Sequence, residues 1–227
     1  MHKLIRRLTT TAAIVSGFAL VFPAHADLAT IDFEPAGLTG LYLDGETFSQ
    51  SVFKMTVEFD AGTIDTAPSL GGSAPSGNLT QFYSQFNEGG LLIERTNGGL
   101  FDLLGFDAAF IPLGTPAGGT TAIIAFGTDA SGGNFGTGFL YGASVGGVFP
   151  FARYSDPLDF ADFSQIRQVR FFSCSLVGSS LCGQPLNNNG QFAIDNIQLA
   201  FVPEPGALPL VALSLLGLAL SRRRSAR

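Results

Sequence analysis

The segment that decides the fold is Val52-Phe53-Lys54-Met55-Thr56-Val57-Glu58-Phe59-Asp60. Its apolar and polar side chains alternate, and the alternation places four apolar residues on one face: Phe53, Met55, Val57 and Phe59. Successive side chains of a β-strand point to opposite faces of the sheet. The period of two therefore predicts a half-buried antiparallel strand.

Further segments with strand character surround this one, separated by turns rich in glycine, proline and asparagine. They are residues 91–95, 100–106, 121–126, 139–143, 166–173 and 192–201. A single helical turn is expected near residues 159–165. The 29 glycines and 22 phenylalanines also favour turns and strands over helices. We predict an all-β fold, a jelly-roll-like sandwich of two antiparallel sheets, flanked by an N-terminal signal helix and a C-terminal hydrophobic helix.

Residues 1–26 have the three parts of a secretory signal peptide. A basic start precedes an apolar stretch over residues 12–22, and the small residues of Ala24-His25-Ala26 follow. The apolar stretch is far shorter than the ~20 residues that cross a bilayer, so a cleaved signal is favoured over an N-terminal anchor. We predict that signal peptidase cleaves after Ala26.

The composition changes abruptly after Phe201. Pro203-Glu204-Pro205 is followed by an apolar run over residues 207–220 and by arginines at 222–224. An apolar helix over residues 206–220 rises only ~22 Å, against a hydrocarbon core of ~30 Å. Local thinning of the bilayer and snorkelling arginines allow such a short span. The positive-inside rule keeps the arginines in the cytoplasm.

These features resemble the PEP-CTERM sorting signal of Gram-negative bacteria. In that family the tripeptide, here Pro203, Glu204 and Pro205, is recognised by an exosortase, a membrane cysteine transpeptidase. The resemblance implies a transient stay in the inner membrane, removal of the tail, and delivery to the cell surface or extracellular matrix, often in bacteria that make exopolysaccharide. A plain C-terminal anchor is the alternative.

The chain therefore divides into a signal peptide at 1–26, a β-sandwich domain at 27–201 and a sorting signal at 202–227. Five basic residues against seventeen acidic ones give the domain a net charge of −12. Binding to phosphates depends on Lys and Arg, so nucleic acid and anionic lipid headgroups are not expected partners. During export the expected partners are signal peptidase and exosortase.

The chemistry of residues 27–201 is restricted. Both histidines, His2 and His25, lie in the signal peptide, so histidine-dependent triads and metal sites are excluded from the mature protein. A carboxylate pair for glycoside hydrolysis stays open, because seventeen acids allow many pairings. We predict a non-catalytic surface or matrix protein with a structural or adhesive role. The alternatives are a glycan-binding module, with extracellular polysaccharide as its partner, and a polysaccharide-acting enzyme.

The last predicted strand changes phase at Asp195-Asn196. Before this point Phe192 and Ile194 share one phase, and after it Ile197 and Leu199 occupy the other. A β-bulge at this point would direct both apolar sets into the core. It would also redirect the Asp195 side chain.

The segment Phe192-Ala193-Ile194-Asp195-Asn196-Ile197-Gln198-Leu199 resembles the final strand of jelly-roll carbohydrate-binding-like domains. In such folds the first and last strands lie together, which implies that Asp32 and Glu34 lie near Asp195. Calcium prefers oxygen ligands, so Asp32, Glu34 and Asp195 are candidate ligands of a structural Ca²⁺. The alternative is that Asp195 caps the bulge by hydrogen bonding to the backbone, while the other two carboxylates are solvated.

The chain has two cysteines, Cys174 and Cys182, and both lie in the exported part. An oxidising compartment and an even count favour a disulfide between them. Closing this loop should stabilise the fold by ~2.5 kcal/mol on the chain-entropy model, less any strain. A two-cysteine metal site is the weaker alternative, because the domain offers no further soft ligand.

Overall fold

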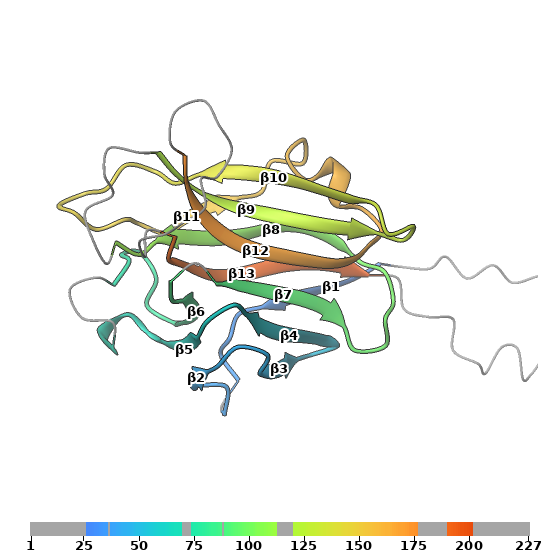
Figure 1. The fold of residues 1–227 in the computed structure, drawn as a ribbon, viewed down its shortest axis with the longest axis horizontal. Coiled ribbons are helices and arrows are strands. Elements are labelled where there is room, and N and C mark those ends of the chain that lie inside the picture. The colour runs from blue at the N-terminus through green and yellow to red at the C-terminus, as the bar shows by residue number, and fades with distance from the viewer. Residues whose placement is uncertain are drawn as a thin grey trace, which may run out of the picture.

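The computed structural model describes residues 26–35, 37–69, 74–87, 89–112, 120–176 and 190–201. These residues form two antiparallel sheets, so the predicted all-β sandwich is confirmed (Figure 1). The predicted signal peptide helix and sorting tail fall outside the described part of the chain, as does Cys182 of the predicted disulfide. Within the described ranges, no helix has the length and apolar character needed to cross a membrane.

Sheet A contains seven strands. They are β1 (Asp27–Ile31), β2 (Gly40–Tyr42), β5 (Gly62–Thr66), β6 (Gln81–Gln85), β8 (Asp102–Phe110), β11 (Ala152–Tyr154) and β13 (Phe192–Phe201). Their order is β11-β8-β13-β6-β5-β2, and β1 also pairs with β13. The first half of β13 pairs with β6 and the second half with β1, while β8 lies along the other edge of β13. The last strand is therefore a central strand.

Sheet B contains six strands. In spatial order they are β10 (Asn134–Leu140), β9 (Thr120–Asp129), β12 (Ile166–Leu176), β7 (Gly90–Arg95), β4 (Phe53–Glu58) and β3 (Thr47–Gln50). A short 3-10 helix, η2 (Ala161–Phe163), lies where the sequence predicts one helical turn. The strand predicted at residues 139–143 instead ends at Leu140 and begins five residues earlier.

Strand β4 forms where the alternation predicts it, but it ends at Glu58. Phe53, Met55 and Val57 are fully buried, whereas Phe59 is 75% exposed. The φ of Phe59 is +70°, a left-handed conformation that no regular strand uses. The chain therefore turns out of the sheet one residue early. The prediction that Phe59 shares the core-facing side was wrong for this reason.

Phenylalanines dominate the core between the sheets. Phe106 of β8 meets three other rings edge to face, with centroid distances of 5.1 Å to Phe139, 5.9 Å to Phe160 and 5.0 Å to Phe171. Such pairs contribute about 0.5–1.5 kcal/mol each beyond the area they bury. The high phenylalanine content is therefore explained largely by packing, as the sequence predicts.

Part of the outer face of sheet A is covered by other parts of the chain. Ser84, Ala193 and Ala109 lie in register on β6, β13 and β8, and none is more than 1% exposed. Ala193 also belongs to a second apolar cluster with Phe82 and Ile111. Small side chains at these positions leave room for a covering layer.

Two segments form part of this cover, and we call them the strap: residues 74–76 and 149–151. They are joined by a parallel bridge in which Ser76 N donates to Phe149 O (3.2 Å) and Phe151 N donates to Ser76 O (2.8 Å). The ring of Phe151 packs edge to face on Phe82 at 5.3 Å. Hydrogen bonds thus hold the two strap segments together, and the Phe151 ring packs the strap against the outer face of sheet A.

Candidate functional site

Strand β13 contains the predicted bulge. It pairs with β8 up to Asp195, which lies opposite Asp107, and the pairing resumes with Gln198 opposite Gly105. Asn196 lies between these pairs and has a φ of +49°. Asparagine tolerates this left-handed conformation better than most residues, so its presence suits the bulge.

The bulge returns both apolar phases of β13 to the core. Phe192, Ile194, Ile197 and Leu199 are all fully buried, as the sequence predicts. A second register shift follows at once, between Gln198 and Leu199, and it places the extra residue on β8. The two irregularities compensate, so the ends of the two strands pair as if neither were present.

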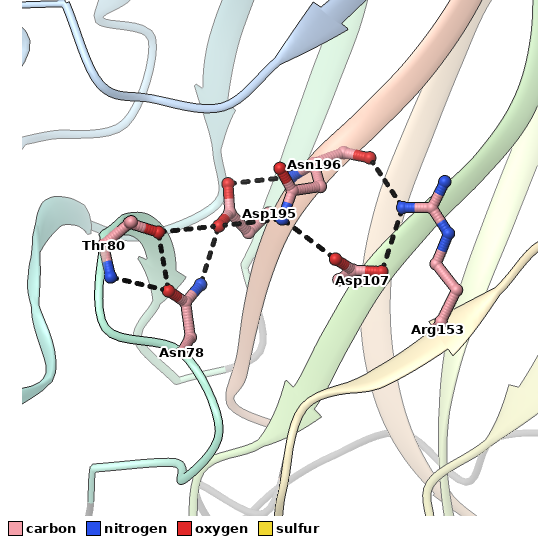
Figure 2. A network of polar contacts seen from close by, with 6 residues as sticks. All are labelled: Asn78, Thr80, Asp107, Arg153, Asp195 and Asn196. Atoms are coloured by element: carbon pink, nitrogen blue, oxygen red, sulfur yellow. Dashed lines mark hydrogen bonds and ion pairs between the residues drawn. The ribbon is translucent and has the colours of Figure 1, made fainter.

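Asp195 points away from the core, because its neighbour Ile194 points into it. It lies on the outer face of sheet A and is only 1% exposed. Its Oδ1 accepts a hydrogen bond from the Asn196 backbone N–H (2.7 Å). Its Oδ2 accepts from Asn78 Nδ2 (2.6 Å) and Asn196 Nδ2 (3.3 Å), with Thr80 Oγ1 at 3.5 Å (Figure 2).

The same network extends across two more strands. Asn196 Nδ2 also donates to Asp107 Oδ2 (2.9 Å), which joins β13 to β8. Arg153 of β11 forms an ion pair with Asp107 Oδ1 (3.0 Å) and donates to the Asn196 carbonyl oxygen (3.3 Å). We call these residues the Asp195 network: Asn78, Thr80, Asp107, Arg153, Asp195 and Asn196 (Figure 2).

Burial raises the pKa of Asp195 to about 7. Hydrogen bonds from Asn78 and from the Asn196 backbone oppose this shift, since they stabilise the ionised form. The nearby carboxylates of Asp107 and Asp32 raise the pKa further. Asp195 therefore titrates near neutral pH although it is shielded from solvent.

The predicted neighbourhood of the first and last strands is confirmed. Strand β1 pairs with β13 from Asp27 opposite Phe201 to Ile31 opposite Ile197. This pairing brings the residue after β1, Asp32, toward the bulge.

The carboxylates of Asp32 and Glu34 are bound to other groups of the protein. Asp32 Oδ1 accepts hydrogen bonds from Gln50 Nε2 (2.6 Å) and from the Glu34 backbone N–H (3.2 Å). Glu34 Oε1 accepts from the Gln81 backbone N–H (2.7 Å). Among the described residues, no group of three or more His, Cys, Asp or Glu side chains is arranged to hold a metal ion. The hydrogen bond from the Asn196 backbone N–H fits the alternative in which Asp195 caps the bulge, and calcium binding stays a prediction.

The Asp195 network is poorly suited to glycoside hydrolysis. The network does contain the pair of nearby carboxyl groups that this chemistry requires, because Asp195 and Asp107 both contact the amide nitrogen of Asn196. The position of Asp195 is what makes the pair unsuitable. A general acid must also come within hydrogen-bond reach of its substrate. Asp195 is buried and already accepts hydrogen bonds on both oxygens, so it does not meet this requirement.

Sequence reasoning identified Asp195 but missed Asn78, Thr80, Asp107 and Arg153. These partners come from three separate segments, and no spacing along the chain connects them. One signal was present at Asp107, an acidic residue inside the otherwise apolar run Phe106-Asp107-Ala108-Ala109-Phe110. An acid in such a run indicates a buried or half-buried polar contact.

Residues 201–224 match the family described as the PEP-CTERM protein-sorting motif. The chain therefore ends in an exosortase sorting signal, as Pro203, Glu204 and Pro205 predict, and the motif indicates an exported cell-surface protein. A search of curated proteins by sequence found no match.

Solved structures show what the body is similar to. A DUF4465 family protein from Bacteroides caccae covers 76% of this chain and 98% of its own, with 11% identity and a TM-score of 0.53. The likeness shows a shared fold. The CBM22-1 xylan-binding domain of Paenibacillus barcinonensis Xyn10C (13% identity, 78% of this chain, 96% of that chain) has a TM-score of 0.33. A family 11 carbohydrate-binding module from Clostridium thermocellum (14%, 76%, 94%) has a TM-score of 0.32.

Proposed function

We propose that the sandwich is a non-catalytic module displayed at the cell surface or in the extracellular matrix, where it has a structural or adhesive role. The sorting motif supports this proposal, since it directs exported proteins to exosortase. In this scheme signal peptidase cleaves after Ala26, and exosortase acts at Pro203-Glu204-Pro205 while the tail is held in the inner membrane.

The observation that carries the proposal is the pairing of the first and last strands. Asp27 lies opposite Phe201, so the chain enters and leaves the sandwich at the same end (Figure 1). Both proposed cleavage sites lie outside these two strands. Removing either terminal segment therefore costs the sandwich no strand, as a module processed at both ends requires.

The lack of catalytic groups also supports the proposal. Residues 27–201 contain no histidine. Their only lysine, Lys54, lies on β4 in an ion pair with Glu94 (2.5 Å), which leaves it unsuited to activating a serine. In the carboxylate pair formed by Asp195 and Asp107, Asp195 is buried, so a substrate cannot reach both carboxyl groups.

Sorting is tested by replacing Pro203, Glu204 and Pro205 with alanine. The variant should accumulate as an unprocessed, membrane-bound form, because the recognition element for exosortase is gone. Fractionation followed by immunoblotting of membrane and extracellular material measures this. Pro209→Ala, in the apolar part of the same tail, is the matched control and should be processed normally. Normal processing of the triple variant would contradict the sorting role.

Glycan binding is the second candidate function. Exposed tyrosines grouped together would mark such a site, because their rings suit the boundary with water. The four tyrosines of the domain form no such group. Tyr83 belongs to the core, and the other three tyrosines pack against it: Tyr42, Tyr141 and Tyr154. A different surface favours this candidate, the outer face of sheet B, where phenylalanine rings are partly exposed.

A further inference from the structure

The outer face of sheet B carries a contiguous apolar surface. Strand pairing aligns Phe126 of β9 with Arg170 of β12 and Leu92 of β7, and it aligns Ile124 with Phe172 in the neighbouring row. All five side chains are half-buried. Paired strands lie ~4.8 Å apart, so these side chains are within contact range of one another. We call four of them the platform: Leu92, Ile124, Phe126 and Phe172.

Two glycines leave the platform open along the edge strand β10. Gly136 lies opposite Phe126 and Gly138 opposite Ile124. A Cβ atom at Gly138 would lie 3.0 Å from Ile124 Cδ1, and one at Gly136 would lie 3.1 Å from Phe126 Cδ2. The platform side chains therefore lean over backbone that carries no side chain. An extended ligand can pass over this edge without obstruction from β10.

A row of uncharged polar groups borders the platform near the C-terminal end of β9. Thr128 Oγ1 donates to Asn134 Oδ1 (2.8 Å), and Gln168 Nε2 donates to Thr128 Oγ1 (3.2 Å). The three residues are in register across β10, β9 and β12. Hydroxyl and amide groups both donate and accept hydrogen bonds, so this row suits a ligand rich in hydroxyls.

Two ion pairs lie on this face. Arg170 forms a two-point contact with Glu58, including Nη2 to Oε1 at 3.0 Å. Lys54 pairs with Glu94 in the row beside it. These two pairs carry no net charge, in a domain whose net charge is −12. Arg167, next to the polar row, is exposed and donates to the Ala130 carbonyl oxygen (3.0 Å). The net negative charge of the domain disfavours an acidic ligand.

We propose that this face binds an uncharged polysaccharide chain. A sugar ring presents C–H groups on its two faces and hydroxyls around its rim, which match an apolar platform bordered by hydroxyl and amide groups. A second copy of the protein is a poorer occupant, because contact would bring two domains of charge −12 together. This proposal rests on glycan binding, the second candidate function, and adds to it the site and the class of ligand.

Calorimetric titration of the exported, processed protein tests the proposal, with mixed-linked β-glucan and galactomannan as neutral probes and polygalacturonate as the acidic one. At least one neutral polymer should bind and polygalacturonate should not. The double substitution Phe126→Ala and Phe172→Ala should weaken binding by tenfold or more, since it removes the two largest platform side chains. Leu104→Ala, on the outer face of sheet A, is the matched control and should bind as the unaltered protein does.

A second variant tests the same site in case the doubly substituted protein does not fold. Thr128→Val keeps the size of the side chain but removes the hydroxyl that joins Asn134 to Gln168, and it should weaken binding by about fivefold. A neutral polymer that bound all variants equally, or binding of neither neutral polymer, would overturn the proposal. Sedimentation showing a dimer that Phe126→Ala dissociates would assign the face to a second copy instead. Sorting is scored in cells and binding on purified protein, so the two proposals fail separately.

Discussion

The two outer faces of the sandwich use opposite kinds of side chain. On sheet A the row Ser84, Ala193 and Ala109 is small and fully covered, while on sheet B the row Phe126, Arg170 and Leu92 is large and half exposed. Small residues are present where another layer of the chain packs on the sheet. Large ones are present where the sheet meets solvent. In these two rows, the side chains of sheet A are fully buried and those of sheet B are partly open to solvent.

Truncating one ring on each face should show this contrast most strongly. Phe82 is buried beneath the strap, so Phe82→Ala should lower the free energy of unfolding by about 3–4 kcal/mol. Phe126→Ala removes a half-buried ring and should cost about 1 kcal/mol. Urea denaturation of both variants measures the difference. Equal losses would show that the strap adds nothing to the burial of sheet A.

The pH dependence of stability should include a contribution from the covered face through Asp195. The pKa of Asp195 is about 7 in the folded chain and ~3.9 in the unfolded chain, so between these values the folded state binds the extra proton. Stability from this group is fully present below pH 4 and is lost as the pH rises toward 7. The loss between pH 5 and 7 should be about 2 kcal/mol.

The matched variant for this measurement is Asp195→Asn, which cannot titrate. Asp107, Asp32, Glu34 and Arg153 also lie around the bulge, so the informative quantity is the difference in slope between variant and unaltered protein. Urea denaturation at pH 5, 6, 7 and 8 provides it. An identical slope in the two proteins would show that Asp195 keeps an ordinary pKa despite its burial.

The smallest effect is expected on the open face. Lys54→Met breaks the ion pair with Glu94. The Lys54 and Glu94 side chains are 40% and 32% exposed, so the substitution should change the free energy of unfolding by ~0.5 kcal/mol or less. Added salt should reduce even this difference. Denaturation at low and high ionic strength measures it. A loss above ~2 kcal/mol would mean that this face is less solvated than the structure indicates.

The sequence predicts the fold best where one face of a strand is exposed. Strand β4 alternates because Lys54, Thr56 and Glu58 meet solvent, and the phase change in β13 reveals its bulge from the pattern of residues alone. Strand β6 was not predicted. Phe82 to Gln85 are all buried on both faces of the strand, so polar and apolar residues do not alternate along it. Strands β2 and β11 are only three residues long, which is too short for a period of two to stand out.

The candidate sites were less predictable than the fold. Asp195 was found because it interrupts an apolar pattern, but its partners are fixed by tertiary pairing of β13 with β8 and by the segment before β6. The platform of sheet B was missed for a related reason. Phe126 and Phe172 look like core residues in the sequence. They point outward because their neighbours Ala125 and Phe171 point into the core, and the apolar composition of both strands hides this choice.

The central position of β13 has a mechanical consequence. While the tail is attached, any pull on the displayed domain reaches it through Phe201, the last residue of this strand. Strand β13 is bonded to β8 on one edge and to β1 and β6 on the other, so a force along its axis loads many backbone bonds at once. An edge strand would instead peel away one bond at a time. The tail thus follows a central strand of sheet A and not an edge strand.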